Sequence, residues 1–389
     1  MYNILTLNKI AACGTDKFDK SLYAYGEEIA NPTAIMVRSA SMHEMELDAE
    51  TIAIARAGAG TNNIPIDKCT EEGIVVFNTP GANANAVKEL VIAGLLLASR
   101  KVVPAIAWAQ TLKGQGAEVG KLVEKGKGQF AGPEILGKKL GVIGLGAIGG
   151  PLANAAIQLG MKVYGYDPYI SIDAAWHLDS HIQPVKTLDE IYENCDIITV
   201  HVPLLDSTRG MIGEEAFSKM KDGVILLNFA RDALVDDDAL EKALASGKVK
   251  RYITDFPNDK TAGMAGVVAI PHLGASTEEA EDNCARMAVR QVMNYLENGN
   301  IQNSVNFPNC DMGICDKASR ITILHKNIPN MIARITGSLA DQNINIENLM
   351  NASKGDYAGT IAETNSPVDD AVVEKIAAVD GIIRVIKIS

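Results

Sequence analysis

The sequence predicts an α/β protein that contains a doubly wound parallel sheet and ends in a smaller α+β region. Short apolar runs recur between helical stretches up to about residue 270, which is typical of strands buried on both faces of a parallel sheet. Near the C-terminus the order of expected elements changes to β-α-β-β-α-β. The 389 residues are enough for two or three domains, each with its own core.

Three apolar runs in the N-terminal part predict strands at residues 34–37, 52–55 and 74–77, each followed by turn residues. From Lys138 onward six further strands are expected, at 140–143, 162–166, 197–202, 224–229, 251–254 and 267–270. Helices are expected between them, for example at 151–159, 188–194 and 237–246. This alternation indicates a doubly wound sheet. The glycine-rich, charged stretch 112–132 is expected to be an exposed loop.

A long helix is expected at 277–297, and a linker-like stretch at 303–317 precedes the α+β region. The strands of that region are expected at 321–324, 344–350, 357–364 and 382–388, and its helices at 329–341 and 368–379. This order is the split βαβ pattern of ferredoxin-like domains.

The composition argues against several classes of partner. Asp and Glu number 48 against 36 Lys and Arg, so the net charge is −12 and no general field attracts nucleic acid or an anionic membrane. The longest apolar run, 90–98, is far shorter than the ~20 residues that cross a bilayer. The six cysteines form no Cys-x-x-Cys pair, so we expect no metal site and no disulfide framework, and a cytoplasmic location.

A glycine-rich turn, residues 144–149, follows the strand 140–143 and precedes a helix. Gly144 allows the tight turn, Gly146 lets a pyrophosphate approach the backbone, and Gly149 lets the helix pack closely on the strand. Asp167 ends the next strand, where its carboxylate would accept hydrogen bonds from ribose hydroxyls and repel a 2′-phosphate. The motif predicts a dinucleotide site that prefers NAD to NADP; the alternative is a glycine turn in an unrelated α/β protein.

Three polar segments follow later strands of the same sheet, at 228–232, 255–259 and 271–277. Ligands bind at the carboxyl edge of such sheets, so Arg231, two carboxylates and His272 are expected near the nicotinamide. Imidazole, with an ordinary pKa of about 6.5, can exchange an alcohol proton at physiological pH, although a single histidine is more often structural. Arg231 can bind a substrate carboxylate with two hydrogen bonds. The set suits oxidation of a hydroxy acid.

These segments resemble motifs of the D-isomer-specific 2-hydroxyacid dehydrogenases. Residues 226–236 are similar to the arginine-bearing motif of that family, and 271–277 to its catalytic-histidine motif. Residues 201–204 with Thr208 are similar to the segment that borders the cofactor. The resemblance covers about residues 1–307.

The resemblance implies a domain organisation. A Rossmann nucleotide domain, 97–283, is inserted in a flavodoxin-like substrate domain, 1–96 with 284–307. A linker, 308–317, then leads to a ferredoxin-like domain of the ACT type, 318–389.

The resemblance also implies roles for single residues. Arg231 would anchor the substrate, His272 would donate and accept the proton, and Asp259, where the family has glutamate, would assist the histidine. Asp255 is similar to the acid that binds the nicotinamide amide. Cofactor contacts are expected from Gly144, Gly146, Ala147, Ile148, Gly149, Asp167, His201, Val202, Pro203, Thr208, Phe229, Ala230, Arg231, Asp255, His272, Gly274 and Ala275.

The substrate loop of the family is similar to residues 56–60. Arg56 and Arg38 are expected to contact a phosphate, and the N–H groups of Gly58 and Ala59 to face a carboxylate. The alternative is that both arginines are ordinary surface cations.

An ACT-type domain is similar to the regulatory domain of the D-3-phosphoglycerate dehydrogenases of serine synthesis. His325, Asn327 and Asn345 match the spacing of residues that bind effector serine in some of those enzymes, although Asn330 stands where the loop usually has glycine. The implied activity is NAD-dependent oxidation of 3-phospho-D-glycerate to 3-phosphohydroxypyruvate, the first step of serine biosynthesis, in a homodimer or homotetramer. The alternatives are a glycerate or hydroxypyruvate reductase, an NAD(H)-sensing corepressor-like protein, and an ACT-like segment that serves only oligomerisation.

Overall fold

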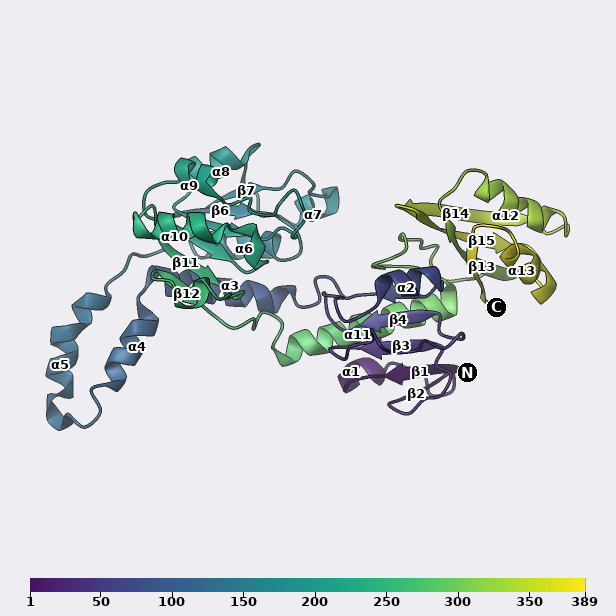
Figure 1. Cartoon of the computed structure of the whole chain (residues 1–389), viewed down its shortest axis with the longest axis horizontal. Coiled ribbons are helices and arrows are strands. Elements are labelled where there is room, and N and C mark those ends of the chain that lie inside the picture. Colours follow the sequence, from purple (N-terminus) through teal and green to yellow (C-terminus); the bar gives the residue numbers. More distant parts are fainter. Residues whose placement is uncertain (389) are drawn as a thin grey trace. The chain divides into compact units, whose positions relative to one another are not determined.

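The computed structural model describes residues 1–388, which fall into two compact units. The first unit consists of Met1–Asn83 together with the chain from Glu278 onward, and the second of Ala84–Thr277. Figure 1 shows the strands and helices of each unit.

The first unit contains a parallel sheet in the order β2-β1-β3-β4-β5, which is the flavodoxin-like order. Its strands are β1 (Tyr2–Thr6), β2 (Tyr23–Gly26), β3 (Ala34–Val37), β4 (Ala53–Arg56) and β5 (Val75–Phe77). The helices are α1 (Ala12–Thr15), α2 (Ile66–Glu71) and the long α11 (Glu278–Asn298). Three of the strands were predicted to within a residue at each end, whereas β1 and β2 were not predicted.

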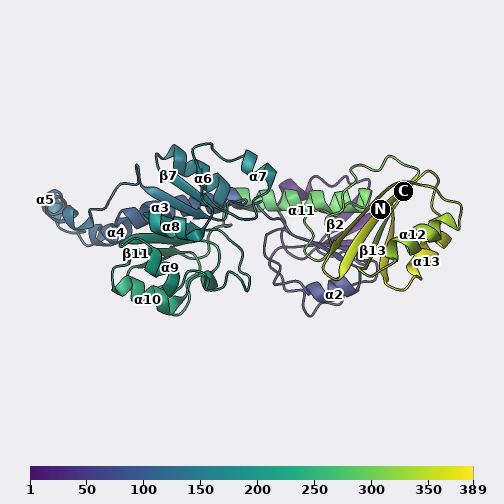
Figure 2. The same ribbon diagram turned by 90° about the horizontal axis from the view of Figure 1, so that it is seen from above.

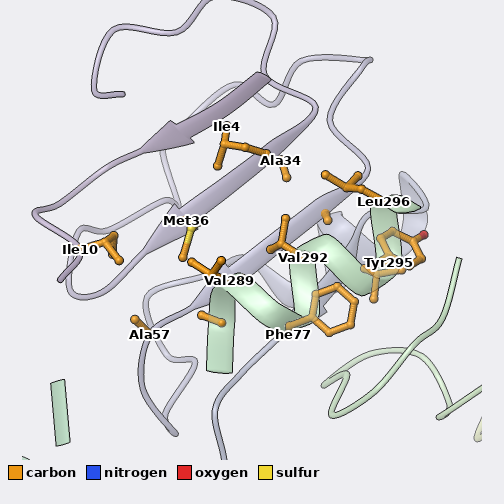
Figure 3. Close-up of a cluster of buried hydrophobic side chains, with 14 of the residues drawn as sticks. Ile4, Ile10, Ala34, Met36, Ala57, Phe77, Val289, Val292, Tyr295 and Leu296 are labelled. Atoms are coloured by element: carbon orange, nitrogen blue, oxygen red, sulfur yellow. The ribbon is translucent and has the colours of Figure 1, made fainter. Parts of the chain in front are cut away.

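Helix α11 covers one face of this sheet (Figure 3). Val289, Val292 and Leu296 lie one helical turn apart and pack with Ile4 and Met36 of the strands. Helix α1 approaches α11 so closely that a side chain at Gly14 would collide with the backbone of Ala285. The returning helix therefore completes a core that the N-terminal strands could not bury alone.

The C-terminal part of the first unit has the predicted β-α-β-β-α-β order. Its elements are β13 (Ser319–Lys326), α12 (Met331–Ala340), β14 (Ile346–Lys354), β15 (Tyr357–Thr364), α13 (Asp370–Ala377) and β16 (Ile382–Ile388). The strands form an antiparallel sheet, β14-β15-β13-β16, and the helices lie together beside it (Figure 2). Ile321 and Ile323 of β13 pack with Ile335, Leu339 and Ile376 of the helices.

Two arginines fasten this antiparallel sheet to the rest of the first unit. Arg320 is fully buried, pairs with Glu363, and donates to the backbone oxygens of Asn298 and Gly313 at 2.7 and 2.8 Å. Arg384 of β16 donates to the backbone oxygens of Thr51 and Glu72 at 3.1 and 2.8 Å. These contacts explain why the C-terminal part and the first sheet form one compact unit.

The second unit contains a parallel sheet in the order β12-β11-β10-β9-β6-β7-β8. Counted within the unit this is 7-6-5-4-1-2-3, the dinucleotide-fold order with one added edge strand. The strands are β6 (Lys139–Ile143), β7 (Lys162–Tyr166), β8 (Gln183–Pro184), β9 (Ile197–Val200), β10 (Val224–Asn228), β11 (Val249–Thr254) and β12 (Val267–Ala269). The helices beside them are α3 (Ala84–Ser99), α6 (Gly149–Gln158), α7 (Ile172–Trp176), α8 (Leu188–Asn194), α9 (Glu214–Lys219) and α10 (Asp237–Ala245). The short β8 was not predicted.

An exposed helical arm leaves the second unit between α3 and β6 (Figure 1). It contains α4 (Val102–Gln110) and α5 (Val119–Gly126), and neither helix has a buried residue. The expectation of a loop at 112–132 is therefore wrong about secondary structure, since most of that stretch is helical. Among the described residues no single helix is long and apolar enough to span a membrane; α3 and α4 reach that length only jointly and are bent by 71°.

Candidate active site

The glycine-rich turn of the second unit has the geometry that its sequence predicts. Gly144 has φ +90°, and a side chain there would lie 2.7 Å from the backbone oxygen of His201. A side chain at Gly149 would collide with the carbonyl of Gly144, whereas the space in front of Gly146 is open. Ala147 and Ile148 lead into α6, and no side chain caps that helix N-terminus. The open backbone at Gly146 and the uncapped helix can receive a diphosphate.

Asp167 lies directly after β7 and supports the same turn. Its Oδ2 accepts a hydrogen bond from the backbone N–H of Leu145 at 2.9 Å, and its Oδ1 accepts one from Tyr169 at 2.9 Å. Each carboxylate oxygen keeps a second acceptor position. The residue predicted to bind the ribose therefore also holds the glycine-rich turn.

The segment after β9 borders this turn. The backbone N–H of His201 donates to Ile143 at 2.7 Å, and its Nε2 lies 2.9 Å from Oγ1 of Thr199. Burial lowers the pKa of His201 to about 4, so the ring is neutral, and its buried Nδ1 has no partner in the described part of the chain. Thr208 donates to the carbonyl of Pro203 at 2.7 Å and accepts from Leu205 at 2.8 Å, which fixes the loop that follows Val202.

The loop that carries Arg231 is held by a buried asparagine at the end of β10. Asn228 donates from Nδ2 to the carbonyl of Arg231 at 2.7 Å and to the hydroxyl of Tyr252 at 3.1 Å, and its Oδ1 accepts from Ala230 at 3.1 Å. Phe229 is buried, and its ring occupies the space in which a side chain at Gly94 of α3 would lie. Asn228 was not predicted to take part in the site, although it is the polar residue that ends an apolar strand.

Arg231 and His272 lie against the same aromatic ring. The guanidinium carbon of Arg231 is 5.4 Å from the ring centroid of Phe256, and the imidazole centroid of His272 is 4.3 Å from it. Burial and then the charge of Arg231 lower the pKa of His272. The arginine and the histidine that the sequence singled out are therefore brought together by the structure.

The two carboxylates differ in their environments. Asp255 is 1% exposed, its Oδ1 has no hydrogen-bond partner among residues 1–388, and burial raises its pKa to about 6. A side chain at Gly274, before Ala275, would lie 3.5 Å from Oδ2 of Asp255. Asp259 is exposed, and no hydrogen bond links it to His272 in the described residues. The role expected of Asp259 beside the histidine stays a prediction.

The predicted substrate loop lies in the first unit. Gly58 has φ +156°, and a side chain there would collide with the guanidinium of Arg56, whose Nε donates to the carbonyl of Arg38 at 3.1 Å. The loop is held on its other side, because Asn78 donates to the carbonyl of Ala59 at 2.6 Å. Arg38 itself pairs with Glu281 of α11 at 2.5 Å, so this cation already has a carboxylate partner.

The predicted effector residues lie in the C-terminal part. His325 is buried, and both ring nitrogens have partners: Nδ1 lies 2.8 Å from the carbonyl of Lys326 and Nε2 lies 2.9 Å from Oγ1 of Thr360. Asn327 donates to the carbonyl of Gly355 at 3.0 Å, and Asn345 is exposed. Asn330 has φ +71°, a conformation that favours glycine.

Comparison with known proteins finds a family match within the second unit and relatives that match more of the chain. Residues 92–274 match the NAD binding domain of the D-isomer specific 2-hydroxyacid dehydrogenases. The chain is 33% identical over 353 residues to a D-3-phosphoglycerate dehydrogenase of Haemophilus influenzae, with 87% of this chain and 82% of the relative covered. It is 39% identical over 252 residues to a hydroxypyruvate reductase of Thermotoga maritima, with 62% and 77% covered.

Other relatives are longer than this chain. A D-3-phosphoglycerate dehydrogenase of Methanocaldococcus jannaschii is 34% identical over 318 residues, which cover 79% of this chain and 58% of the relative. Among solved structures, an NAD⁺-bound 3-phosphoglycerate dehydrogenase of Entamoeba histolytica matches with TM-score 0.60 and 26% identity, covering 78% of this chain and 98% of that chain. The chain thus spans little more than half the length of some relatives and most of the length of others.

Proposed function

The chain belongs to the D-isomer-specific 2-hydroxyacid dehydrogenase family, and from this premise we propose that it oxidises 3-phospho-D-glycerate to 3-phosphohydroxypyruvate. NAD is the cofactor of the matched domain. One observation carries the proposal. In a dinucleotide fold, Arg231 after β10 and His272 after β12 both contact the ring of Phe256.

The residues present fit NAD. The Gly144–Gly149 turn offers an open backbone and an uncapped helix to the diphosphate, and Asp167 keeps acceptor positions for ribose hydroxyls. His201 and Asp255 each bury a polar atom that has no partner in the described chain, which suits a polar ligand better than an apolar core. Asp255 is proposed to bind the nicotinamide amide.

The protein groups are proposed to act on the two ends of the substrate. Arg231 binds the carboxylate through two N–H groups and draws electron density from the reacting oxygen. His272 takes the hydroxyl proton during oxidation and returns it during reduction. NAD, when bound, supplies the hydride acceptor. In the first unit, Arg56 and Arg38 are proposed for the phosphate, and the N–H groups of Gly58 and Ala59 for the carboxylate.

One observation favours a second candidate, a reductase of unphosphorylated hydroxypyruvate. Arg38 is already paired with Glu281, so a substrate phosphate must compete with that carboxylate, and a relative with this activity is 39% identical. The test compares kcat/KM for 3-phosphoglycerate and glycerate with NAD. A higher value for glycerate refutes the phosphate assignment.

Variants sharpen this comparison. Arg56→Gln should lower kcat/KM for 3-phosphoglycerate about tenfold or more while affecting glycerate less, because a charge-assisted hydrogen bond to the phosphate is lost. Arg286→Gln is the matched control, since Arg286 pairs with Asp282 on the exposed side of α11. Equal losses for both substrates would place Arg56 outside the phosphate site.

The C-terminal part is proposed to be an ACT domain, with 318–389 as its limits, after the substrate domain (1–96, 284–307), the nucleotide domain (97–283) and the linker (308–317). The β-α-β-β-α-β order and the antiparallel sheet support this. Serine is the proposed effector, with Asn327 and Asn345 as contacts; His325 would have to give up Thr360 to take part. Calorimetry of the full chain with serine tests this, and no binding at millimolar serine would leave oligomerisation as the role of the domain.

We also propose a homodimer or homotetramer. Val102, Val103 and Ile106 expose apolar side chains on the α4 arm, which suits burial against a second copy. Light scattering of the wild type and of Ile106→Asp tests this, and a monomeric wild type would contradict it. The cytoplasmic location remains a prediction.

A further inference from the structure

A polar pocket lies in the first unit, where three segments that are far apart in the sequence meet. These segments are the end of β5, the turn at 303–309 and the end of β14. The pocket has a volume of about 500 Å³, which is the size of sites for small metabolites. Its polar lining residues are Asn78, Asn303, Ser304, Asn309, Ser353 and Lys354.

The protein itself uses only part of the hydrogen-bonding capacity of this pocket. The ammonium of Lys354 donates to the backbone oxygens of Ser304 and Val305 at 3.1 and 2.8 Å, so one of its three N–H groups remains for a ligand. Oδ1 of Asn309 accepts from the backbone N–H of Asn303 at 2.9 Å, which leaves the Nδ2 donors of Asn309 without a partner among residues 1–388. The pocket therefore presents a cation and a side-chain amide whose donors are not yet used.

The charge of the lining selects the kind of ligand. Of the described residues that line the pocket, Lys354 alone is charged, and none carries a carboxylate that could hold an ammonium group. The neighbouring amides and hydroxyls can donate hydrogen bonds to oxygen. Hydrogen bonds from an ammonium to carboxylate or phosphate oxygens are about twice as strong as those between neutral groups. The ligand that fits is therefore a small anion without an ammonium group.

Asn78 joins this pocket to the proposed substrate loop, residues 56–60. It lines the pocket, and its Nδ2 donates to the carbonyl of Ala59 at 2.6 Å. The backbone N–H of the next residue, Thr79, donates to the carbonyl of Gly58 at 3.1 Å. Gln291 of α11 donates to the carbonyl of Asn78 at 3.0 Å and holds this connection from the helix. A ligand that binds Asn78 therefore acts on a residue that is bonded to the substrate loop.

We propose that this pocket is a second binding site, which takes a small carboxylate or phosphate anion, and that Asn78 transmits its occupancy to the substrate loop. The site is separate from Asn327 and Asn345, the proposed serine contacts, because neither residue lines it. The binding site goes beyond the proposed reaction, and only its effect on kinetics rests on the proposed function.

Calorimetric titration of the full chain with citrate and with inorganic phosphate, each at constant ionic strength, tests the site. At least one of these anions should bind with a dissociation constant in the millimolar range or below. The anion that binds more tightly shows whether the pocket prefers carboxylate or phosphate oxygens. Absence of binding by both anions up to about 10 mM would overturn the proposal.

Two variants locate the bound anion. Lys354→Gln should weaken binding about tenfold or more, because a charge-assisted hydrogen bond is lost. Lys354 also holds the turn at 303–309, so Ser353→Glu provides a second variant, which keeps the lysine and places a repelling charge beside it. Lys68→Gln is the matched control, since Lys68 of α2 likewise donates to a backbone oxygen, that of Met45, at 3.4 Å. An affinity within twofold of wild type in Ser353→Glu, or an equal loss in Lys68→Gln, would overturn the site.

Hydrogen–deuterium exchange of the full chain follows the transmission without turnover. The anion that binds, citrate or phosphate, should slow exchange in peptides that contain the turn at 303–309 and change it in peptides that contain the substrate loop. In Asn78→Ala the first effect should remain and the second should vanish. Binding that leaves exchange at 303–309 unchanged would overturn the site. A response of the substrate loop that is absent in the wild type, or that persists in Asn78→Ala, would contradict the transmission.

Kinetics connect the site with the proposed reaction. The bound anion should change KM for 3-phosphoglycerate by about twofold or more in the wild type but not in Ser353→Glu. An effect that persists in Ser353→Glu would show that the anion competes at the substrate site and would contradict regulation through the pocket. If the wild type forms no NADH from any hydroxy acid, the proposed function fails, while calorimetry and hydrogen exchange still decide whether the pocket binds an anion.

Discussion

Replacing Asp167 tests the cofactor site most directly, because this carboxylate has two separable tasks. It is proposed to bind ribose hydroxyls, and it accepts the backbone N–H groups of Leu145 and Tyr169 at 2.9 Å each. Asp167→Ala removes both tasks. Asp167→Asn keeps one acceptor oxygen, so it retains one of the two backbone bonds and part of the ribose contact.

The magnitude follows from the charge of the acceptor. Hydrogen bonds to an ionised group contribute about 1.5–3 kcal/mol, so losing the ribose contact should weaken NADH binding by about 10- to 150-fold. Losing the bond to Leu145 also loosens the turn between Gly144 and Gly146 and places the alanine variant at the upper end of that range. NADPH binding should not weaken in parallel, because the repulsion of its 2′-phosphate is removed as well. The preference for NADH over NADPH therefore narrows.

Calorimetric or fluorescence titration of both nucleotides measures the dissociation constants. Asp173→Ala, which removes the same charge from the exposed start of α7, is the matched control and should leave both constants near the wild-type values. We expect NADH affinity to be highest in the wild type, lower in Asp167→Asn and lowest in Asp167→Ala. An NADH dissociation constant of Asp167→Ala within twofold of wild type, with the same ratio to NADPH, would refute the ribose assignment.

Three further predictions concern catalysis and stability. His272→Ala should lower kcat by about 10²- to 10⁴-fold. In the wild type, kcat/KM for oxidation should rise with pH through a midpoint below about 6.5, because burial and Arg231 lower the pKa of His272, which must be unprotonated. A pH–rate profile with a midpoint above about 7 would contradict this. Arg231→Lys keeps the charge but loses the planar fork, so steady-state kinetics should show KM for the hydroxy acid raised about tenfold or more, and an unchanged KM would exclude the bidentate contact. Glu363→Gln should lower the free energy of unfolding by about 3–5 kcal/mol in urea titrations, because Arg320 is left buried without a counter-charge, and a variant as stable as wild type would contradict this account. Burial alone raises the pKa of Glu363, but hydrogen bonds from Arg320 and Asn348 outweigh burial and lower that pKa. The stabilisation by this pair is therefore present above the ordinary glutamate pKa and is lost as pH falls through the lowered pKa.

The elements that could be predicted are strands whose apolar runs end abruptly in turn residues and helices with a clear first residue. β7 at Lys162–Tyr166, α8 at Leu188–Asn194 and β15 at Tyr357–Thr364 have the predicted bounds. For α8 the reason is local, since Thr187 and Glu190 form a capping box that begins the helix at a defined residue.

The elements that could not be predicted lack such local signals. β1 mixes Asn3 and Thr6 with its apolar residues, and its burial depends on α11, which lies more than 270 residues later in the chain. α5 has apolar residues at helical spacing, but it buries none of them and contains two glycines, and glycine lowers helix propensity, so its composition favours a loop. The aromatic contact near α5 lies within the arm itself, where the ring centroids of Trp108 and Phe130 are 5.3 Å apart.

The candidate site also has parts that could be predicted from the sequence and parts that could not. The turn at Gly144 and the pair Arg231 and His272 follow from motifs, because parallel strands bring their carboxyl ends to one edge. The partners of the other cations and rings come from remote segments: Glu281, which binds Arg38, is 243 residues away. No spacing rule reveals that such a residue already has a partner.

The loops of the candidate site depend on polar residues buried where strands end. Asn228 at the end of β10 makes three hydrogen bonds to the backbone of Ala230 and Arg231, and Thr254 at the end of β11 makes one to the backbone of Phe256. Both residues are fully buried, and an unpaired polar group there would cost about 1–3 kcal/mol, so each of the two loops has a strong preference for the one conformation that satisfies these groups. That preference fixes where the side chains of Arg231 and Phe256 begin. The placement of the Arg231 side chain and of the Phe256 ring therefore depends on buried polar side chains at the ends of the two strands.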